Sequence, residues 1–175
     1  MILKIEEGNL KAIESYHLPL FNEIPDVGLY LNQCATYINR ALSPLFGISI
    51  TESMISNYVK KKLIANPIKK QYSRENLAYL LFITLAKNAA SLDDIQQLIT
   101  IQKESYSTEI AYEYFRCEFE AILKQVFGIK ADKADKGESE SAEEELLRNI
   151  IVTIAHKIYI DMAFSVLRKE NDQIC

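Results

Sequence analysis

Glycine and proline are scarce in this sequence, with five and four residues among 175. These two residue types interrupt helices most often, so long stretches of the chain can run as helix without a break. Hydrophobic residues make up 49% of the chain, which is enough to build a sizeable core. We therefore expect an all-α, mainly helical protein, whose length fits one domain or a small module with a helical appendage.

Cysteine and histidine are also sparse. The three cysteines, Cys34, Cys117 and Cys175, are odd in number and form no CxxC pair, which argues against a disulfide framework and against a zinc site. Only His17 and His156 could serve as imidazole bases. No HExxH, GxSxG, P-loop or GxGxxG motif occurs, so the sequence predicts no enzyme, no cofactor and no metal.

Long apolar segments are missing as well. The chain begins Met1-Ile-Leu-Lys-Ile-Glu-Glu, which includes acidic residues and lacks the apolar core of a signal peptide. No uninterrupted run of about 18 apolar residues follows. We therefore expect a cytoplasmic protein without a membrane partner.

Positive charge is concentrated in one segment, although the net charge of the chain is −4. From Ile50 to Arg74 there are six lysine or arginine residues and one acidic residue, Glu52, so this segment carries +5 and the remainder −9. A basic segment in an acidic chain is typical of a nucleic-acid contact. The alternative is a lysine-rich face that is only solvated.

The pattern at 52–62 predicts an amphipathic helix with a distinct polar side. Thr51 is a suitable N-cap, and Glu52 beside it suits the positive end of the helix dipole. Short polar side chains on an exposed helix can approach and hydrogen-bond base edges in the major groove of DNA. The expected inward side consists of Ile55, Tyr58 and Val59, and the polar side of Ser53, Ser56, Asn57 and Lys60.

The segment after this helix adds further positive charge. Asn66-Pro67 turns the chain, and Lys69-Lys70-Gln71-Tyr72 is expected on a short loop or hairpin. Lysines there would contact DNA phosphates, which position a protein without reading sequence. The predicted DNA-binding residues are Thr51, Ser53, Ser56, Asn57, Tyr58, Lys60, Lys61, Lys69, Lys70, Gln71, Tyr72 and Arg74.

Further helices are expected on both sides of this region. Hydrophobic spacing and capping residues locate their ends. The expected elements are a helix at 5–17, an extended strap at 18–25, a helix capped by Asp26 and ending at Leu42, and two helices capped by Ser73 and Ser91.

The C-terminal third predicts two longer helices. The first covers about 108–127 and ends at Gly128. Residues 130–142 contain no large apolar residue and are expected to form a mobile loop. The second helix, about 143–169, would span roughly 40 Å. Its apolar stripe fits either a core or a dimer seam, and consists of Leu147, Ile150, Ile151, Ile154, Ile158, Met162 and Val166.

Several motifs follow one another in a recognisable order. They are Met54-Ile-Ser-Asn-Tyr-Val-Lys-Lys-Lys-Leu-Ile64, Pro67, Tyr72-Ser73, Leu77 and Ser91-Leu-Asp-Asp-Ile95. This order resembles the DNA-binding half of MerR-type regulators, in which a recognition helix ending in Gly-Leu-Ile leads to a basic wing that contains proline. The resemblance implies a winged helix-turn-helix whose wing includes Lys69 and Lys70. The sequence departs from the family pattern at Ser56, Asn57 and Lys62, where that family usually has arginine, an aromatic residue and glycine.

A second resemblance covers the chain up to about residue 130. It is carried by Leu18-Pro19, Ile24-Pro-Asp-Val-Gly-Leu-Tyr-Leu-Asn-Gln33, Met54-Ile-Ser-Asn-Tyr-Val-Lys60 and Lys69-Lys-Gln-Tyr-Ser-Arg-Glu75. These motifs are similar to a bacterial family catalogued as domain of unknown function 1836, which implies a MerR-like winged helix without an established ligand or target. We accordingly divide the chain into an N-terminal helix and strap at 1–26, a MerR-like winged helix-turn-helix at 27–104 and a C-terminal helical region at 105–175.

Two functions follow as hypotheses. In the first, the protein is a DNA-binding transcription regulator, and a homodimer held by its C-terminal helices presents two copies of helix 52–62 to half-sites about 34 Å apart. In the second, it is a non-enzymatic protein-interaction module that uses the fold without binding DNA, with helices 108–169 as its contact surface. A small-molecule effector stays unknown, because aromatic residues at helical spacing belong to the core more often than to a ligand pocket between the C-terminal helices. The residues in question are Tyr106, Tyr112, Tyr114 and Tyr159.

Overall fold

The computed structural model describes residues 5–130 and 141–172 of the chain. Within these ranges the regular structure is helical, and the prediction of an all-α fold is confirmed. The helices are α1 (Glu7–Glu14), the 3-10 turn η1 (Phe21–Glu23), α2 (Leu31–Leu42), α3 (Glu52–Lys60), α4 (Arg74–Ala86), α5 (Leu92–Ser105), α6 (Thr108–Val126) and α7 (Ala142–Asp172). The β-pairing between described residues is limited to two isolated bridges.

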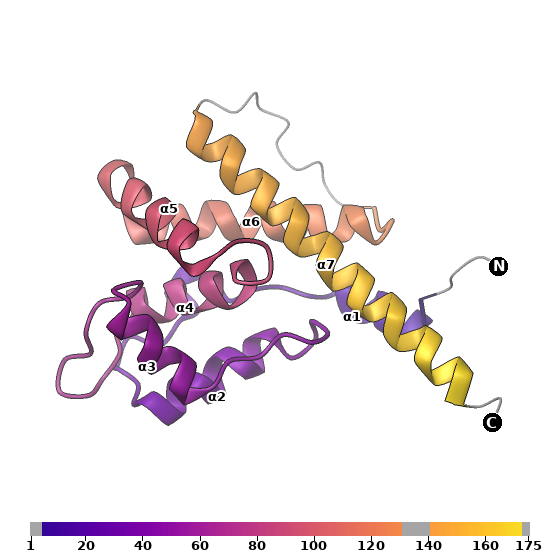
Figure 1. Cartoon of the computed structure of the whole chain (residues 1–175), viewed down its shortest axis with the longest axis horizontal. Coiled ribbons are helices and arrows are strands. Elements are labelled where there is room, and N and C mark those ends of the chain that lie inside the picture. Colours follow the sequence, from indigo (N-terminus) through magenta and orange to yellow (C-terminus); the bar gives the residue numbers. More distant parts are fainter. Residues whose placement is uncertain (1–4, 131–140, 173–175) are drawn as a thin grey trace.

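Helix α4 lies at the centre of the molecule. Its sequence, RENLAYLLFITLA, is apolar on nearly every side, and such a helix is stable only when neighbours cover it all round. Helix α2 packs against it from one side, and α6 and α7 pack against it from the other (Figure 1). Leu77, Leu80 and Leu81 are completely buried as a result.

Local signals placed several helix ends correctly. The hydroxyl oxygens of Thr51, Ser73 and Ser91 each accept a hydrogen bond from the backbone N–H three residues later, at 3.1 to 3.2 Å. These three predicted N-caps are therefore confirmed. Gly128, with φ of 71°, follows the end of α6 as predicted.

The predicted cap at Asp26 is wrong, because α2 begins five residues later with Tyr30 as its N-cap. The residues in between are drawn into a contact with a distant part of the chain. The backbone of Leu29 exchanges two hydrogen bonds with Tyr72, at 3.1 and 2.8 Å. Gly28, with φ of 75°, turns the chain into this bridge. Helix α1 is also shorter than the predicted 5–17.

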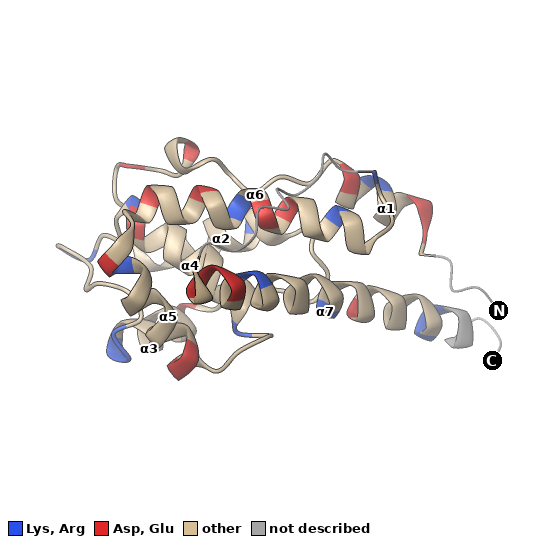
Figure 2. Ribbon diagram, turned by 90° about the horizontal axis from the view of Figure 1, so that it is seen from above, with Lys and Arg blue, Asp and Glu red and all other residues tan. Residues whose placement is uncertain are grey.

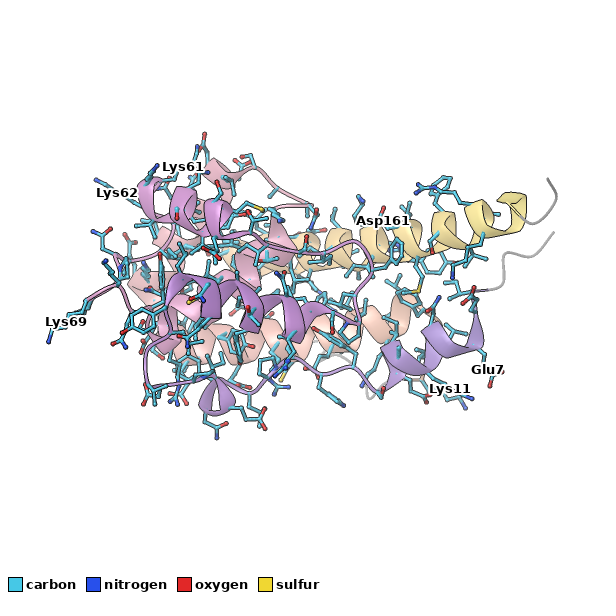
Figure 3. The ribbon with its side chains drawn as sticks, turned by 90° about the horizontal axis from the view of Figure 1, so that it is seen from below. Glu7, Lys11, Lys61, Lys62, Lys69 and Asp161 are labelled. Carbon is cyan, nitrogen blue, oxygen red and sulfur yellow. The ribbon has the colours of Figure 1, made fainter. Side chains whose placement is uncertain are left out.

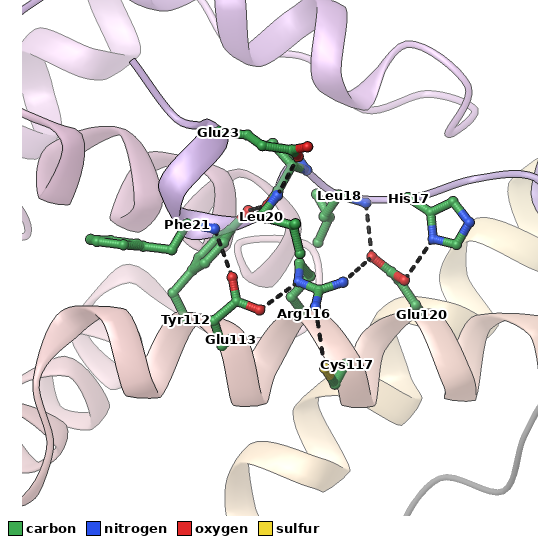
Figure 4. Close-up of polar contacts among 11 residues, drawn as sticks. His17, Leu18, Leu20, Phe21, Glu23, Tyr112, Glu113, Arg116, Cys117 and Glu120 are labelled. Carbon is green, nitrogen blue, oxygen red and sulfur yellow. Dashed lines mark hydrogen bonds and ion pairs between the residues drawn. The ribbon is translucent and has the colours of Figure 1, made fainter. Parts of the chain in front are cut away.

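The strap before α2 is fixed to α6 through backbone hydrogen bonds (Figure 4). The backbone N–H of Leu18 donates to Glu120 Oε1 at 2.9 Å, and that of Phe21 donates to Glu113 Oε1 at 2.6 Å. The predicted extended strap therefore packs on the molecule, and it contains the short turn η1.

Arg116 joins the two glutamates that hold the strap. Its Nε donates to Glu113 Oε2 at 2.8 Å, and its Nη1 donates to Glu120 Oε1 at 3.2 Å. His17 Nδ1 lies 2.9 Å from the other oxygen of Glu120. The Glu120 side chain is 11% exposed and that of Glu113 is 33% exposed, and their charged and hydrogen-bonding partners offset the cost of this burial.

Helix α7 crosses α6 and packs against it along one side (Figures 1 and 2). Most of its predicted apolar stripe forms part of the core, and the buried members are Ile151, Ile154, Ile158, Met162 and Val166. Residues Ala142–Lys169 are also long and apolar enough to cross a membrane by length and composition alone, a property that the core helix of a soluble protein shares. The predicted loop at 130–142 falls mainly on residues 131–140, which lie outside the described residues.

Cys34 gives a chemical test of this core. Its side chain is completely buried, and burial raises the pKa of the thiol to about 12, so that the thiolate is not formed in neutral solution. We expect iodoacetamide to alkylate the exposed Cys117 in the native protein and to modify Cys34 only after unfolding in urea. Mass spectrometry of the digested protein would measure both sites, and equal labelling of Cys34 and Cys117 in the native state would contradict the packing described.

Candidate nucleic-acid interface

The connection between α2 and α3 is held by one asparagine. Asn39 Oδ1 accepts a hydrogen bond from the Ile50 N–H at 2.8 Å, and Asn39 Nδ2 donates to the Ile50 carbonyl at 2.9 Å. Lys87 Nζ donates to the Ser49 carbonyl at 2.7 Å. These contacts place Thr51 where it caps α3. The sequence analysis did not single out Asn39. The only sequence signal for its role is that a polar residue stands beside the apolar positions of α2.

Helix α3 has the two sides that the sequence predicts. Ile55 and Tyr58 are buried, and α3 packs against α2. On the other side Ser53, Asn57 and Lys60 are exposed, as is the capping residue Thr51, and Ser56 is partly exposed. The polar stripe therefore faces solvent, which a contact with a DNA groove requires.

Helix α3 ends at a lysine with a left-handed backbone. Lys62 has φ of 59°, its N–H donates to the Val59 carbonyl at 3.0 Å, and the Leu63 N–H donates to the Tyr58 carbonyl at 2.9 Å. This pair of hydrogen bonds is the Schellman motif, in which the left-handed position usually holds glycine. Leu63 then enters the core, while the Lys62 side chain stays outside.

A tight hairpin follows between α3 and α4. Ile68 and Gln71 form an isolated bridge with hydrogen bonds of 3.0 and 2.9 Å, and Lys69 and Lys70 stand between them. Both lysines have positive φ, 50° and 65°, which is the geometry of a type I′ turn. Both are exposed, and so is Ile68, which sequence reasoning did not single out. The expected short loop or hairpin is thus a two-residue hairpin.

Lysines from α3 and from the hairpin gather at one end of the molecule. Figure 3 shows Lys61, Lys62 and Lys69 at the end opposite Glu7 and Lys11, and Figure 2 shows basic colouring at the end of α3. We call this the lysine surface, and it consists of Lys60, Lys61, Lys62, Lys69 and Lys70, all of which are exposed.

Some acidic groups lie near this surface. Lys61 Nζ is 3.8 Å from Asp93 Oδ1, and both side chains are largely exposed. Such a pair contributes little to stability and is screened by salt. The Lys61 carbonyl also accepts a hydrogen bond from Gln96 Nε2 at 2.9 Å, which ties the end of α3 to α5.

Three of the predicted DNA-binding side chains lie elsewhere. Tyr58 and Tyr72 are buried, and burial raises the pKa of both hydroxyl groups. Arg74 Nε donates to the Ile24 carbonyl at 2.8 Å, so this side chain supports the strap. These three side chains are therefore not part of the candidate interface. Gln71 is partly exposed and packs closely against Gly28.

One backbone feature unites the lysine surface. Among the described residues, the non-glycine residues with positive φ are Lys62, Lys69 and Lys70. A side chain in this region of backbone space costs about 1–2 kcal/mol relative to an unstrained one, and glycine avoids the cost. All three strained positions therefore hold exposed lysines, where fold stability alone would favour glycine or asparagine.

Comparison with known proteins gives a family without an assigned activity. The family model described as Domain of unknown function (DUF1836) matches residues 19–115, more than half of the chain. The match runs from the strap into α6 and includes the whole lysine surface, whereas α7 lies outside it. No curated protein and no solved structure matches the chain.

The strain at Lys62 can be measured. The substitution Lys62→Gly should raise the free energy of unfolding by about 1 kcal/mol. The backbone strain that it relieves exceeds the entropic cost of the greater freedom of glycine in the unfolded chain. Lys62→Ala is the matched control, since it removes the charge but keeps a Cβ atom, and it should leave stability nearly unchanged. Urea unfolding measures both, and a destabilising Lys62→Gly would contradict the left-handed conformation at this position.

Proposed function

The chain belongs to the family described as Domain of unknown function (DUF1836), and we propose that it is a transcription regulator that binds double-stranded DNA through its lysine surface. Helix α3 is the recognition helix in this proposal, and the hairpin at 68–71 is a wing on the phosphate backbone. The proposed contacts are Thr51, Ser53, Ser56, Asn57, Lys60, Lys61, Lys62, Lys69, Lys70 and Gln71.

The main support for the proposal is that, among the described residues, lysine occupies the three positions with a strained, left-handed backbone. Residues in sparsely populated backbone conformations concentrate where a site needs them. Lys62 precedes the segment 63–68 and the pair Lys69-Lys70 follows it, and all three lysines are exposed. A phosphate backbone is a partner that gains from three lysine charges held at fixed positions.

The polar stripe of α3 supplies the second part of the interface. Ser53 and Asn57 are exposed and short, so the helix axis can come close to base edges. Asn57 offers both a donor and an acceptor, which suits adenine in the major groove. In this arrangement α3 reads sequence, while the lysines fix its position.

A MerR-like winged helix-turn-helix is the finer description that we propose for this region. Its support is the order of elements, in which α2, α3, the hairpin, α4 and α5 follow one another as in that family. The Leu29–Tyr72 bridge ties the hairpin to the start of α2, so that wing and recognition helix keep a fixed relation.

We also propose a homodimer held by the C-terminal helices. Helix α7 exposes three large apolar side chains in the single chain, Leu146, Ile160 and Phe164, and the exposed residues Thr153 and Lys157 lie between them on the same side. Leu146 and Ile160 are 14 residues apart, and Ile160 and Phe164 are 4 apart, so the three lie on one side of the helix. A dimer through this side would present two copies of α3 to half-sites about 34 Å apart.

The same exposed side of α7 favours a second candidate function. An apolar helix face is also the contact surface of a protein-interaction module. In that case the helix-turn-helix would support the fold without binding DNA.

Fluorescence anisotropy with random and AT-rich duplexes, titrated with salt, separates the two functions. The unmodified protein should bind, with an affinity that falls steeply as salt rises. The variant Lys60→Glu, Lys69→Glu, Lys70→Glu should lose affinity about tenfold or more, because phosphate contacts become repulsive. Circular dichroism would verify that this variant keeps its helices.

A matched variant controls for net charge. Lys11→Glu, Lys130→Glu, Lys169→Glu makes the same change in charge at exposed positions outside the lysine surface, and its affinity should stay within about threefold of the unmodified protein. Equal loss in both variants would contradict the proposed interface. Absence of binding even at low salt would contradict DNA binding and favour the protein-interaction module.

A further inference from the structure

A cavity of about 270 Å³ lies between α4, α5, α6 and the first turn of α7. This volume is close to the lower end of the range of ligand pockets in proteins, about 300–1,000 Å³. The wall is mainly apolar and aromatic, with Phe82 on α4 and Phe115 on α6 among its members. Their rings meet edge to face with centroids 5.0 Å apart, so this part of the wall is well packed.

A short chain of hydrogen bonds fixes another part of the wall. The Tyr79 hydroxyl donates to Gln102 Oε1 at 2.8 Å and accepts from Thr108 Oγ1 at 3.3 Å. Gln102 Nε2 in turn donates to the Tyr106 carbonyl at 2.7 Å. These bonds join α4, α5 and the start of α6, so the cavity is formed before any ligand enters.

Exposed apolar side chains collect at the rim. Tyr106, Ile110 and Tyr114 all line the cavity, and 50%, 58% and 38% of their surface is exposed. Large apolar side chains that stay exposed around a hollow mark a binding site more often than isolated ones do. The rim therefore points to an occupant with apolar surface of its own.

The charge of the lining limits the class of ligand. The described lining residues include two glutamates, Glu143 and Glu144, and no lysine, arginine or histidine. An anionic ligand would meet repulsion from these two carboxylates, and the ammonium of Lys103 lies over the ring of the lining residue Tyr79, 5.0 Å from its centroid, without itself lining the cavity. A ligand without negative charge meets no such repulsion.

No side chain of the described residues, 5–130 and 141–169, fills the cavity. Residues 131–140 connect α6 to α7 and contain no large apolar residue. The first helical segment of the chain is also distant from the cavity. Glu6 Oε1 lies 3.3 Å from Lys169 Nζ, at the end of α7 opposite the cavity. A separate small molecule is therefore the occupant that fits.

We propose that this cavity binds a small, uncharged organic ligand with an aromatic or branched aliphatic body of roughly ten non-hydrogen atoms. The lining residues Phe82, Phe115 and Tyr112 contact its apolar body, and the rim residues Tyr106 and Tyr114 cover it. The site does not depend on whether the lysine surface binds DNA.

Calorimetric titration with two probes of similar size tests the proposal. The first is 2-naphthol, which is uncharged at neutral pH, and the second is 2-naphthoate, which is anionic. The unmodified protein should bind 2-naphthol at one site per chain, and 2-naphthoate about tenfold more weakly or not at all. Failure to bind 2-naphthol up to its solubility, or tighter binding of 2-naphthoate, would overturn the proposal.

Filling the cavity locates the binding. Ala111→Leu adds volume to the wall and should weaken 2-naphthol binding about tenfold or more, whereas Ala121→Leu, on α6 but outside the lining, should leave it unchanged. If Ala111→Leu does not fold, Ile101→Phe fills the cavity from α5 and should have the same effect. Unchanged binding in a folded cavity-filling variant would overturn the proposed location.

Discussion

The fold depends on the burial of α4. A helix with apolar residues on nearly every side must be covered from all directions, and α2, α6 and α7 provide most of that cover. This requirement separates two functional regions. The lysine surface lies beyond α2 and α3, where the chain turns outward before α4 begins, and the cavity lies on the other side of α4, toward α5 and α6. The lysine surface and the cavity therefore lie on different sides of α4 and share no residue.

Much of the helical plan was predictable, because it rests on short-range signals. Thr51, Ser73 and Ser91 cap their helices through a hydrogen bond to a residue three positions away, so the sequence nearby contains all that is needed. Asp26 is also a residue type that caps helices, but the prediction that it caps α2 is wrong. The reason is a long-range one: Leu29 pairs with Tyr72, 43 residues later, and this bridge keeps the chain extended where a helix was expected. Propensity gives way when a distant backbone segment offers the better hydrogen bonds.

The candidate site was predictable in its charge but not in its geometry. The solvent-facing stripe of α3 and the exposed lysines agree with the helical period and with residue type. Tyr72 was assigned to DNA with the lysines beside it, and Tyr58 was assigned to DNA although the helical period already predicted it on the inward side. Both lie in the core, since a tyrosine ring is mostly apolar surface. The left-handed lysines and the Asn39 contact were out of reach, because φ values and a hydrogen bond across a turn appear only in three dimensions.

In the proposed interface, Lys69 and Lys70 occupy a strained turn because DNA binding requires their charge there. Replacing them together, Lys69→Asn and Lys70→Gly, supplies the residues that a type I′ turn prefers. Two quantities should change in opposite ways: the free energy of unfolding should rise by about 1–2 kcal/mol per chain, while DNA affinity falls and the slope of its logarithm against that of salt decreases in magnitude by about 1.8 per chain, or about 3.6 for the proposed dimer. A variant that is more stable and binds duplex DNA with unchanged affinity and unchanged salt slope would contradict the proposed interface.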